Sequence, residues 1–227
     1  MGRDPEAEKR RGKIGWLYDV QASEVDVEAV VDVQFDLQGT LIPKDHGYAL
    51  YQEIARLLHW VAAEDLFGIH HIQGADTGLG EMVLNKRAKL VVRVPSHHVS
   101  ELHALTGQAI ELGGHALTIG AAKTKELSRH VPLFAHCVTT GSDDEAAFAA
   151  DVIRILDDMH IDARFICGMR QTIRMPEGEI SGYSLLLHGL PVQHAIRVQQ
   201  IGLGTNRKIG CGIFIPHKSL MPLPTID

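Results

Sequence analysis

Cysteine, aromatic residues and long apolar runs are all scarce in this chain. Its 227 residues include three cysteines and no CxxC pair, so a disulfide framework and a structural zinc site are disfavoured and a reducing compartment is favoured. Aromatic residues make up 5% of the chain, which argues against stacking on many single-stranded bases. No apolar stretch reaches the roughly 18 residues that span a bilayer, and the charged first residues lack the apolar segment of a secretory signal. We therefore expect a cytoplasmic protein with no membrane partner.

Histidine is abundant, but an ordered ligand spacing is missing. The chain has 14 histidines and neither an HxxxH nor an HExxH pattern. The doublets His70-His71 and His97-His98 would point to opposite faces if they lie in extended segments. We therefore expect no metal and no cofactor. A metal-dependent hydrolase whose histidines meet only in space stays open as a distant alternative.

Positive charge is in deficit overall and is concentrated near the C-terminus. The formal net charge is −6, which speaks against broad nucleic-acid binding. Residues 160–227 carry seven Lys or Arg against four Asp or Glu, a balance of +3 that leaves −9 for residues 1–159. This distribution permits a local anion site in the C-terminal segment.

Apolar periodicity predicts an α+β fold in the first half of the chain. Residues 30–38 alternate apolar and polar side chains, which is typical of a half-buried strand, and residues 88–95 predict a second strand. We expect one helix from His46 with Asp45 as its N-cap, and a short helix over 96–105 with Ser96 as its N-cap. A further strand is expected near 67–72, and a hairpin over 109–122 around Gly113-Gly114.

The same order of elements then restarts. Strands are expected over 132–141, 163–170, 182–190 and 211–217, with helices after a Ser142–Glu145 capping box and over 192–202. We therefore predict tandem ferredoxin-like domains. The expected boundaries are a flexible tail at 1–15, an N-terminal domain at 16–124, a linker at 125–132, and a C-terminal domain with a glycine-rich loop at 133–227.

The loop "GLGTNRKIGCGIF", residues 202–214, places Gly202-x-Gly204 and Gly210-x-Gly212 on either side of Arg207-Lys208. Its amides could form a concavity for phosphate, with the two cations adding charge-assisted contacts. It is not a P-loop, because no Gly-Lys-Ser/Thr follows, and the order helix–loop–strand is the reverse of a dinucleotide fingerprint. The alternative is a tight turn that is rich in glycine for steric reasons alone.

These features together resemble a known family. The double GxG with its Arg-Lys pair, followed by an apolar strand in a tandem ferredoxin-like chain, resembles the RAMP superfamily of CRISPR RNA-binding proteins. "IPKDHGYALYQEIA" together with "GLGTNRKIGCGIFIPHK" is similar to its repeat-processing endoribonucleases, over about Val25 to Lys218. The resemblance implies an RRM-like fold and metal-independent cutting of CRISPR precursor RNA within each repeat. It also implies a stem-loop repeat RNA as partner, with other Cas proteins of an effector complex as further partners.

Cutting RNA without a metal needs a base that removes the proton of a 2′-hydroxyl, and histidine titrates in a suitable range. The resemblance implies His46 as the catalytic residue. The positive end of a helix starting there would help to keep its ring neutral. Family members often add a tyrosine or a lysine, and the local candidates are Lys44, Tyr48 and Tyr51. On an ideal helix both tyrosines point well away from His46, so Lys44 is the preferred partner.

RNA contacts are expected mainly in the basic C-terminal segment. The candidates are the loop residues, one helical arginine and two arginines of a basic connector: Gly202, Gly204, Arg207, Lys208, Gly210, Gly212, Arg197, Arg170 and Arg174. The "NKRAK" stretch, with Lys86, Arg87 and Lys89, is either a second RNA-binding strip or a solvated hairpin face. His188, His194 and His217 are expected to pack or to make minor RNA contacts.

A second reading of the resemblance stays open. A non-catalytic CRISPR RNA-binding subunit would use the same loop to hold processed RNA, with His46 inert. Loss of cleavage without loss of binding on changing His46 would separate the enzyme from such a subunit. Activity in the absence of metal would separate it from a metal-dependent hydrolase.

Overall fold

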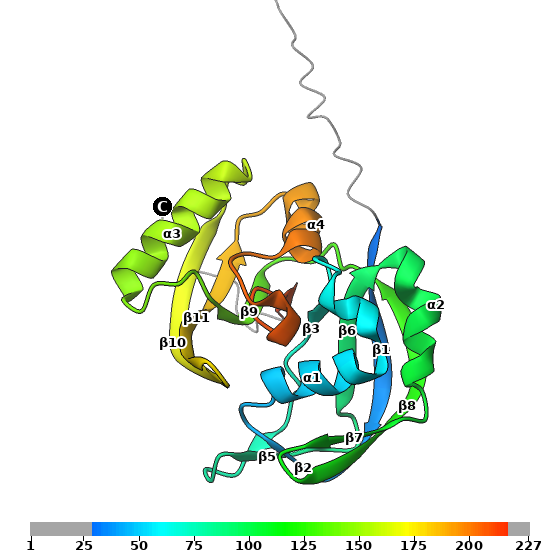
Figure 1. Ribbon diagram of the computed structural model, residues 1–227. Coiled ribbons are helices and arrows are strands. Elements are labelled where there is room, and N and C mark those ends of the chain that lie inside the picture. The colour runs from blue at the N-terminus through cyan, green and yellow to red at the C-terminus, as the bar shows by residue number, and fades with distance from the viewer. Residues whose placement is uncertain (1–28, 218–227) are drawn as a thin grey trace, which may run out of the picture.

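The computed structural model describes residues 29–217, so the predicted tail at 1–15 lies outside the described residues. Figure 1 shows two α/β units packed side by side, the first in blue to green and the second in yellow-green to red. Each unit has its own hydrophobic core. Among the described residues, no helix is both long and apolar enough to cross a membrane.

The first unit is built on a five-stranded sheet in the order β3-β6-β1-β8-β7, with all neighbouring strands antiparallel. Its strands are β1 (Val30–Gln38), β3 (Gly68–Ile69), β6 (Lys89–Pro95), β7 (Ala109–Leu112) and β8 (His115–Glu126). Helix α1 (Gly47–Leu57) follows β1, and α2 (Val99–Leu102) lies between β6 and β8 along the chain. The predicted strand at 30–38 and the hairpin around Gly113-Gly114 are confirmed.

A small three-stranded sheet at the edge of this unit was not predicted. It has the order β2-β5-β4 and consists of β2 (Leu41–Pro43), β4 (Ala75–Asp76) and β5 (Glu81–Val83). Strands of two or three residues are too short to show the alternation that reveals a longer strand.

The second unit repeats the strand order of the first. Its elements are β9 (Leu133–Val138), α3 (Glu145–Asp158), β10 (Arg164–Met175), β11 (Gly178–His188), α4 (Val192–Ile201) and β12 (Phe214–Pro216). The sheet runs β10-β11-β9-β12, which is second–third–first–fourth, as in β3-β6-β1-β8. Helix α3 buries one side chain per turn against this sheet: Phe148, Val152 and Leu156. The tandem ferredoxin-like fold is confirmed.

The helix starts differ from the predictions. Helix α1 has His46 as its N-cap, while the Asp45 carboxylate accepts a hydrogen bond from the Arg174 backbone amide at 2.7 Å. The predicted Ser96 cap is wrong, because Pro95 precedes a 3-10 helix, η2 (Ser96–His98). The capping box before α3 is also wrong. Asp144 caps that helix by accepting from the Ala147 amide at 3.0 Å, because its carboxylate is two residues closer to the first free amides than Ser142 is.

The connections also depart from expectation. Strand β8 continues to Glu126, inside the predicted linker at 125–132, and β9 begins at Leu133. Helix α1 ends at Leu57, and a 3-10 helix, η1 (His59–Ala62), follows it after Leu58. The predicted basic connector is the tip of the β10–β11 hairpin, which pairs through Met175 and Gly178.

A buried arginine joins the two units. Arg93 on β6 has no exposed surface and donates from Nε and Nη2 to the Asp32 carboxylate at 2.7 and 2.9 Å. Its Nη1 donates to the Gln199 and Phe214 carbonyls of the second unit, at 2.9 and 2.8 Å. His70 completes the set, with Nε2 3.2 Å from Asp32. These contacts fix the angle at which the units meet and therefore position everything between them.

Candidate active site and nucleic-acid interface

His46 lies at the start of α1 and is only 1% exposed. Its Nδ1 lies 3.0 Å from the Pro43 carbonyl and 3.2 Å from that of Lys44, so Nδ1 carries the proton and donates. Its Nε2 accepts a hydrogen bond from the Ile72 backbone amide at 3.1 Å. The backbone therefore fixes one tautomer of His46, with its lone pair on Nε2.

Two further histidines, which the sequence analysis did not single out as site residues, surround His46. His71 follows β3, and its ring centroid lies 4.7 Å from that of His46. His136, on β9 of the second unit, stacks on His71 at 3.8 Å with an interplanar angle of 13°. Within the described part of the chain, neither His71 nor His136 has a ring nitrogen in a hydrogen bond to the protein. We call His46, His71 and His136 the imidazole cluster.

The doublet His70-His71 was a usable signal for this site. Its two rings do point to opposite sides, as expected for an extended segment: His70 contacts Asp32 and His71 contacts His46. What the sequence could not show is that the second side meets His136, because that contact crosses between the units.

All three rings of the imidazole cluster are held neutral. Burial lowers the pKa of His46, although the hydrogen bonds to the Pro43 and Lys44 carbonyls oppose the shift. Burial is the largest cause that lowers the pKa of His71 far below its ordinary value, and electrostatic interactions with His136, His46 and Lys44 add to the shift. Burial and the Lys44 charge lower the pKa of His136. The helix end was expected to keep His46 neutral, whereas burial is the largest cause of its lowered pKa in the structure.

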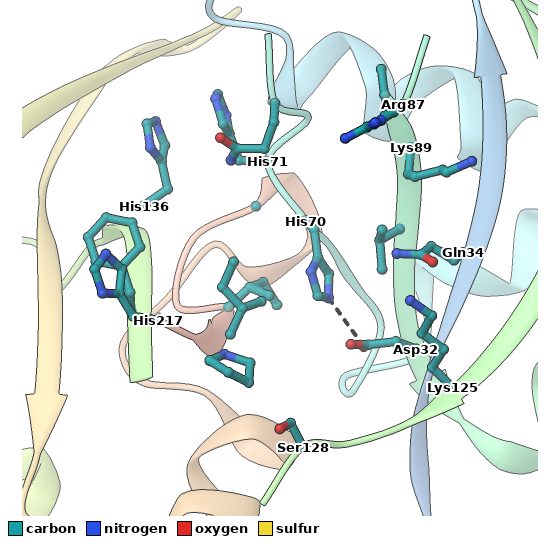
Figure 2. Close-up of a pocket in the computed structure, with 18 of the residues that line it drawn as sticks. Asp32, Gln34, His70, His71, Arg87, Lys89, Lys125, Ser128, His136 and His217 are labelled. Carbon is teal, nitrogen blue, oxygen red and sulfur yellow. Dashed lines mark hydrogen bonds and ion pairs between the residues drawn. The ribbon is translucent and has the colours of Figure 1, made fainter. Parts of the chain in front are cut away.

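The imidazole cluster lines a cavity of about 240 Å³ between the units, together with Lys44 and the β10 residues Gln171–Arg174. A larger groove of about 1060 Å³ shares His70, His71 and His136 with this cavity. Figure 2 shows His71, His136 and His217 on one side of the groove and Arg87, Lys89 and Lys125 on the other. The imidazole cluster thus lies where a small cavity opens into a groove with a cationic wall.

The predicted partners of His46 occupy different environments. Lys44 is half-exposed at the cavity, where its Nζ pairs with the Asp76 carboxylate at 2.5 Å. Tyr48 and Tyr51 are partly buried and pack against Cys137, Ile209 and Cys211. Neither tyrosine lines either of the two cavities. Of the three predicted partners, Lys44 lines the cavity, whereas the two tyrosines take part in packing.

Glycines of the loop at 202–214 leave space for close approach of other backbone segments of the protein. Gly204 has φ +77°, and a Cβ there would lie 2.2 Å from the Thr139 carbonyl oxygen. Gly212 has φ +66°, and a Cβ there would lie 2.3 Å from the Leu203 carbonyl oxygen. Gly202 and Gly212 are buried, so the steric reading accounts for these two glycines, and no RNA contact is proposed for them. RNA contact at Gly204 and Gly210 stays a prediction.

The two cations of the loop also turn inward. Arg207 donates from Nε to the Leu66 carbonyl at 3.2 Å, and burial lowers its pKa to about 9. Lys208 donates to the Ala62 carbonyl at 2.5 Å. The Arg207 guanidinium is thus engaged with the first unit, and its contact with RNA stays a prediction. Lys208 is only half-buried, and its RNA contact stays a prediction.

The remaining predicted arginines are dispersed. Arg174 lines the small cavity and pairs with Glu179 at 3.1 Å. Arg170 is exposed on β10, with its Nη2 2.9 Å from the Ser181 hydroxyl, and Arg197 lies on α4. Neither Arg170 nor Arg197 lines the cavity or the groove. Lys86, Arg87 and Lys89, the second strip considered in the sequence analysis, do line the groove.

The imidazole cluster does not form a metal-ligand set. Among the described residues, one group has three ligand atoms within 4.8 Å of one another, and it consists of Glu64, His97 and His98. That group involves none of the residues of the cavity or the groove. The chemistry of the cavity is therefore that of three neutral imidazoles beside a lysine.

Comparisons with known proteins agree with this architecture. A family model described as Cas6 Crispr matches residues 31–219. The CRISPR-associated endonuclease Cas6 of Myxococcus xanthus (strain DK1622) is 33% identical over 187 residues, which cover 82% of this chain and 81% of that protein.

Solved structures agree in fold. A Cas6-related protein of Pyrococcus furiosus superposes with a TM-score of 0.59 at 14% identity, covering 83% of this chain and 99% of the other. A structure titled CRISPR associated protein Cas6 gives a TM-score of 0.57 at 14% identity, covering 83% and 100%. One titled as a RAMP protein binding different RNA substrates gives 0.56 at 11% identity, covering 82% and 98%.

Proposed function

This chain belongs to the Cas6 family, and on that premise we propose that it is an endoribonuclease that cuts CRISPR precursor RNA within each repeat. The observation that carries the proposal is the imidazole cluster beside Lys44, in a cavity that opens into a groove with cationic side chains. Such a site offers a proton acceptor and a cation without a metal ion. The free thiols of the chain fit the cytoplasm, which we propose as its compartment.

His46 is the proposed general base. Its Nδ1–H is committed to the Pro43 carbonyl, which leaves the Nε2 lone pair as the acceptor. A 2′-hydroxyl of the RNA would displace the Ile72 amide from Nε2 and lose its proton to the ring. The resulting 2′-oxygen attacks the adjacent phosphorus in line as the bond from phosphorus to the 5′-oxygen breaks. The leaving 5′-oxygen takes up a proton from the Lys44 ammonium, and the proton held by His46 is returned to solvent, which also reprotonates Lys44. The products are a 2′,3′-cyclic phosphate and a 5′-hydroxyl.

Lys44 and the other two imidazoles act on the phosphate. Three neutral rings accept protons but do not supply one at the outset, so the Lys44 ammonium is the cation that stabilises the developing charge. A neutral imidazole still carries one N–H donor, and His71 and His136 have no protein partner for it within the described residues. They are therefore placed to donate to non-bridging phosphate oxygens.

The groove is the proposed path of the RNA strand towards the cavity. Lys86, Arg87 and Lys125 line it, and phosphate contacts of this kind give an affinity that falls as salt rises. A stem-loop repeat is the proposed partner, because an aromatic content of 5% does not suit extensive base stacking. Other Cas proteins of an effector complex are proposed as further partners.

The test uses the full-length protein and a labelled repeat RNA in EDTA. We expect the wild type to cut, and His46→Ala to slow cleavage about 10²–10⁴-fold while RNA affinity changes little. A substrate with 2′-deoxy at the nucleotide before the cut should not be cleaved. His59→Ala, an exposed histidine just beyond α1, serves as the matched control. If His46→Ala cuts normally and His71→Ala does not, the base is His71 and the assignment above fails.

One observation favours a second function. His46 is buried with both ring nitrogens hydrogen-bonded to backbone, which is also what an inert structural histidine would show. A non-catalytic subunit that holds CRISPR RNA would bind the repeat tightly and leave it intact in the same experiment. Uncut RNA in the wild-type reaction, with and without divalent cations, would support that function.

A further inference from the structure

A second histidine cluster lies in the first unit, outside the cavity and the groove. His97 and His98 belong to η2, whose tight winding brings both rings to one side with their centroids 4.0 Å apart. Glu64, in the segment between η1 and β3, faces them. One ligand atom from each of the three residues lies within 4.8 Å of the others. We propose that Glu64, His97 and His98 bind a zinc ion.

The distance between two of the ligand atoms fits the metal better than it fits a hydrogen bond. His98 Nε2 lies 3.4 Å from Glu64 Oε2, beyond the usual hydrogen-bond range. In a tetrahedral zinc site with bonds of about 2.0–2.1 Å, neighbouring ligand atoms lie about 3.3–3.4 Å apart. The pair therefore already spans one edge of the coordination tetrahedron.

Neighbouring groups fix two of the ligands before any metal enters. Glu101 Oε1 lies 2.8 Å from His98 Nδ1, which places the proton there and leaves Nε2 as the ligand lone pair. Metal-ligating histidines commonly have such a carboxylate behind them. Trp60 stacks on the His98 ring at 3.8 Å with an interplanar angle of 6°. The other oxygen of Glu64, Oε1, accepts the Leu66 amide at 2.8 Å.

Two imidazoles and one carboxylate form a donor set that zinc uses with water in the fourth position. The exposure of His97 leaves room for that water. The bound ion would link η2 to the segment carrying Glu64. The carbonyls on either side of Glu64, at Ala62 and Leu66, receive the hydrogen bonds from Lys208 and Arg207. Zinc would therefore stiffen the support of the glycine-rich loop.

The test measures zinc binding directly on the full-length protein after treatment with EDTA and removal of the chelator. Titration with Zn²⁺ should show one high-affinity site per chain and a rise in melting temperature. His98→Ala and Glu64→Gln should weaken binding at least tenfold, and Glu101→Gln about 10–100-fold. His103→Ala, an exposed histidine of the same segment, should bind as the wild type does.

A spectroscopic arm guards against variants that fold poorly. Co²⁺ added to the wild type should give the intense visible bands of a four-coordinate site, and Zn²⁺ should remove them. A wild type that binds neither ion, or variants that bind zinc as the wild type does, would overturn the proposal. The readout is independent of RNA cleavage, which should continue in EDTA while the melting temperature falls. Failure of the zinc site would therefore leave the proposed nuclease untouched.

Discussion

Two polar regions lie between the units, and each contains one of two adjacent histidines, His70 and His71, which follow β3. His70 contacts Asp32, which also pairs with Arg93, and we call these three residues the paired region. In it the buried charges face each other, and the Arg93 and His70 nitrogens are hydrogen-bonded to the Asp32 carboxylate. His71 joins His46 and His136, a region of neutral rings in which two have ring nitrogens without a protein partner among the described residues. Paired charges hold the units in place, whereas unpaired neutral acceptors remain available to a substrate. The paired region therefore stabilises the interface between the units, whereas the imidazole cluster is the part of it that can bind a substrate.

The largest effect should come from breaking the paired region. Arg93→Met leaves Asp32 partly buried without its main counter-charge, so we expect a loss of about 3–5 kcal/mol in the free energy of unfolding. Lys89 and Asp36 form the same kind of pair on the same two strands, but in solvent, and Lys89→Ala should cost less than about 1 kcal/mol. Urea unfolding of both variants makes the measurement.

A double variant gives the opposing check. Asp32→Asn with Arg93→Met removes both charges, and it should recover part of the loss because no uncompensated charge stays inside. Equal losses for Arg93→Met and Lys89→Ala would show that burial of the first pair carries no energetic weight, and the comparison between the regions would collapse.

The adjacent histidines should separate stability from activity. His70→Ala removes a buried partner of Asp32, so we expect about 1–3 kcal/mol of lost stability. His71→Ala removes no protein hydrogen bond and should cost less stability, while it should slow RNA cleavage about tenfold or more through the lost contact to phosphate. Thermal melts and single-turnover cleavage on both variants test this. A stable His70→Ala protein that cuts slowly would reverse the assignment.

The smallest expected effect lies in the pH dependence of cleavage. Burial lowers the pKa of His46, so the ring stays neutral and active below pH 6.5 and the rate should fall only at lower pH. The Lys44 charge lowers the pKa of His71 and His136 but is not a cause of the His46 shift. Lys44→Met should therefore lower the rate without moving the acid limb of the profile. A limb that moves to higher pH would identify His71 or His136 as the base.

Most of the fold could be predicted from the sequence, because its strands and turns follow from patterns of neighbouring residues. Alternation over residues 30–38 and the Gly113-Gly114 turn each specify one element with near neighbours alone. The order of such elements then predicted the two units, and the glycine-rich loop together with the motif around His46 carried the resemblance to the family. The helix caps failed because Asp45 and Ser142 found tertiary partners, the Arg174 amide and the Asp151 carboxylate. The helix-capping preference of these two residues was outweighed by contacts with residues farther along the chain, which a local pattern does not include.

The site was only half accessible, for the same reason. His46 could be named from its motif and the start of a helix, but His136 meets the cluster from a strand of the other unit. Arg207 looked like a surface cation because glycines surround it, and the structure turns it to the Leu66 carbonyl. The sequence could not show that His97 and His98 lie in η2, where their ring centroids are 4.0 Å apart.

The C-terminal end of α4 adds a negative partial charge beside Arg93 and Arg207, in addition to the charge of Asp32. Two guanidinium groups, of Arg93 and Arg207, reach the Gln199 carbonyl at 2.9 and 3.5 Å, while Asp32 is the one carboxylate among them. Carbonyls of the last helical turn have no partner within the helix and carry its negative partial charge, equivalent to roughly half an electron. Gly202, with φ +80°, ends the helix at Ile201 and so keeps that carbonyl available. Gly202, the first glycine of the loop, therefore places a negative partial charge between the two units, because the helix ends where this glycine begins the loop.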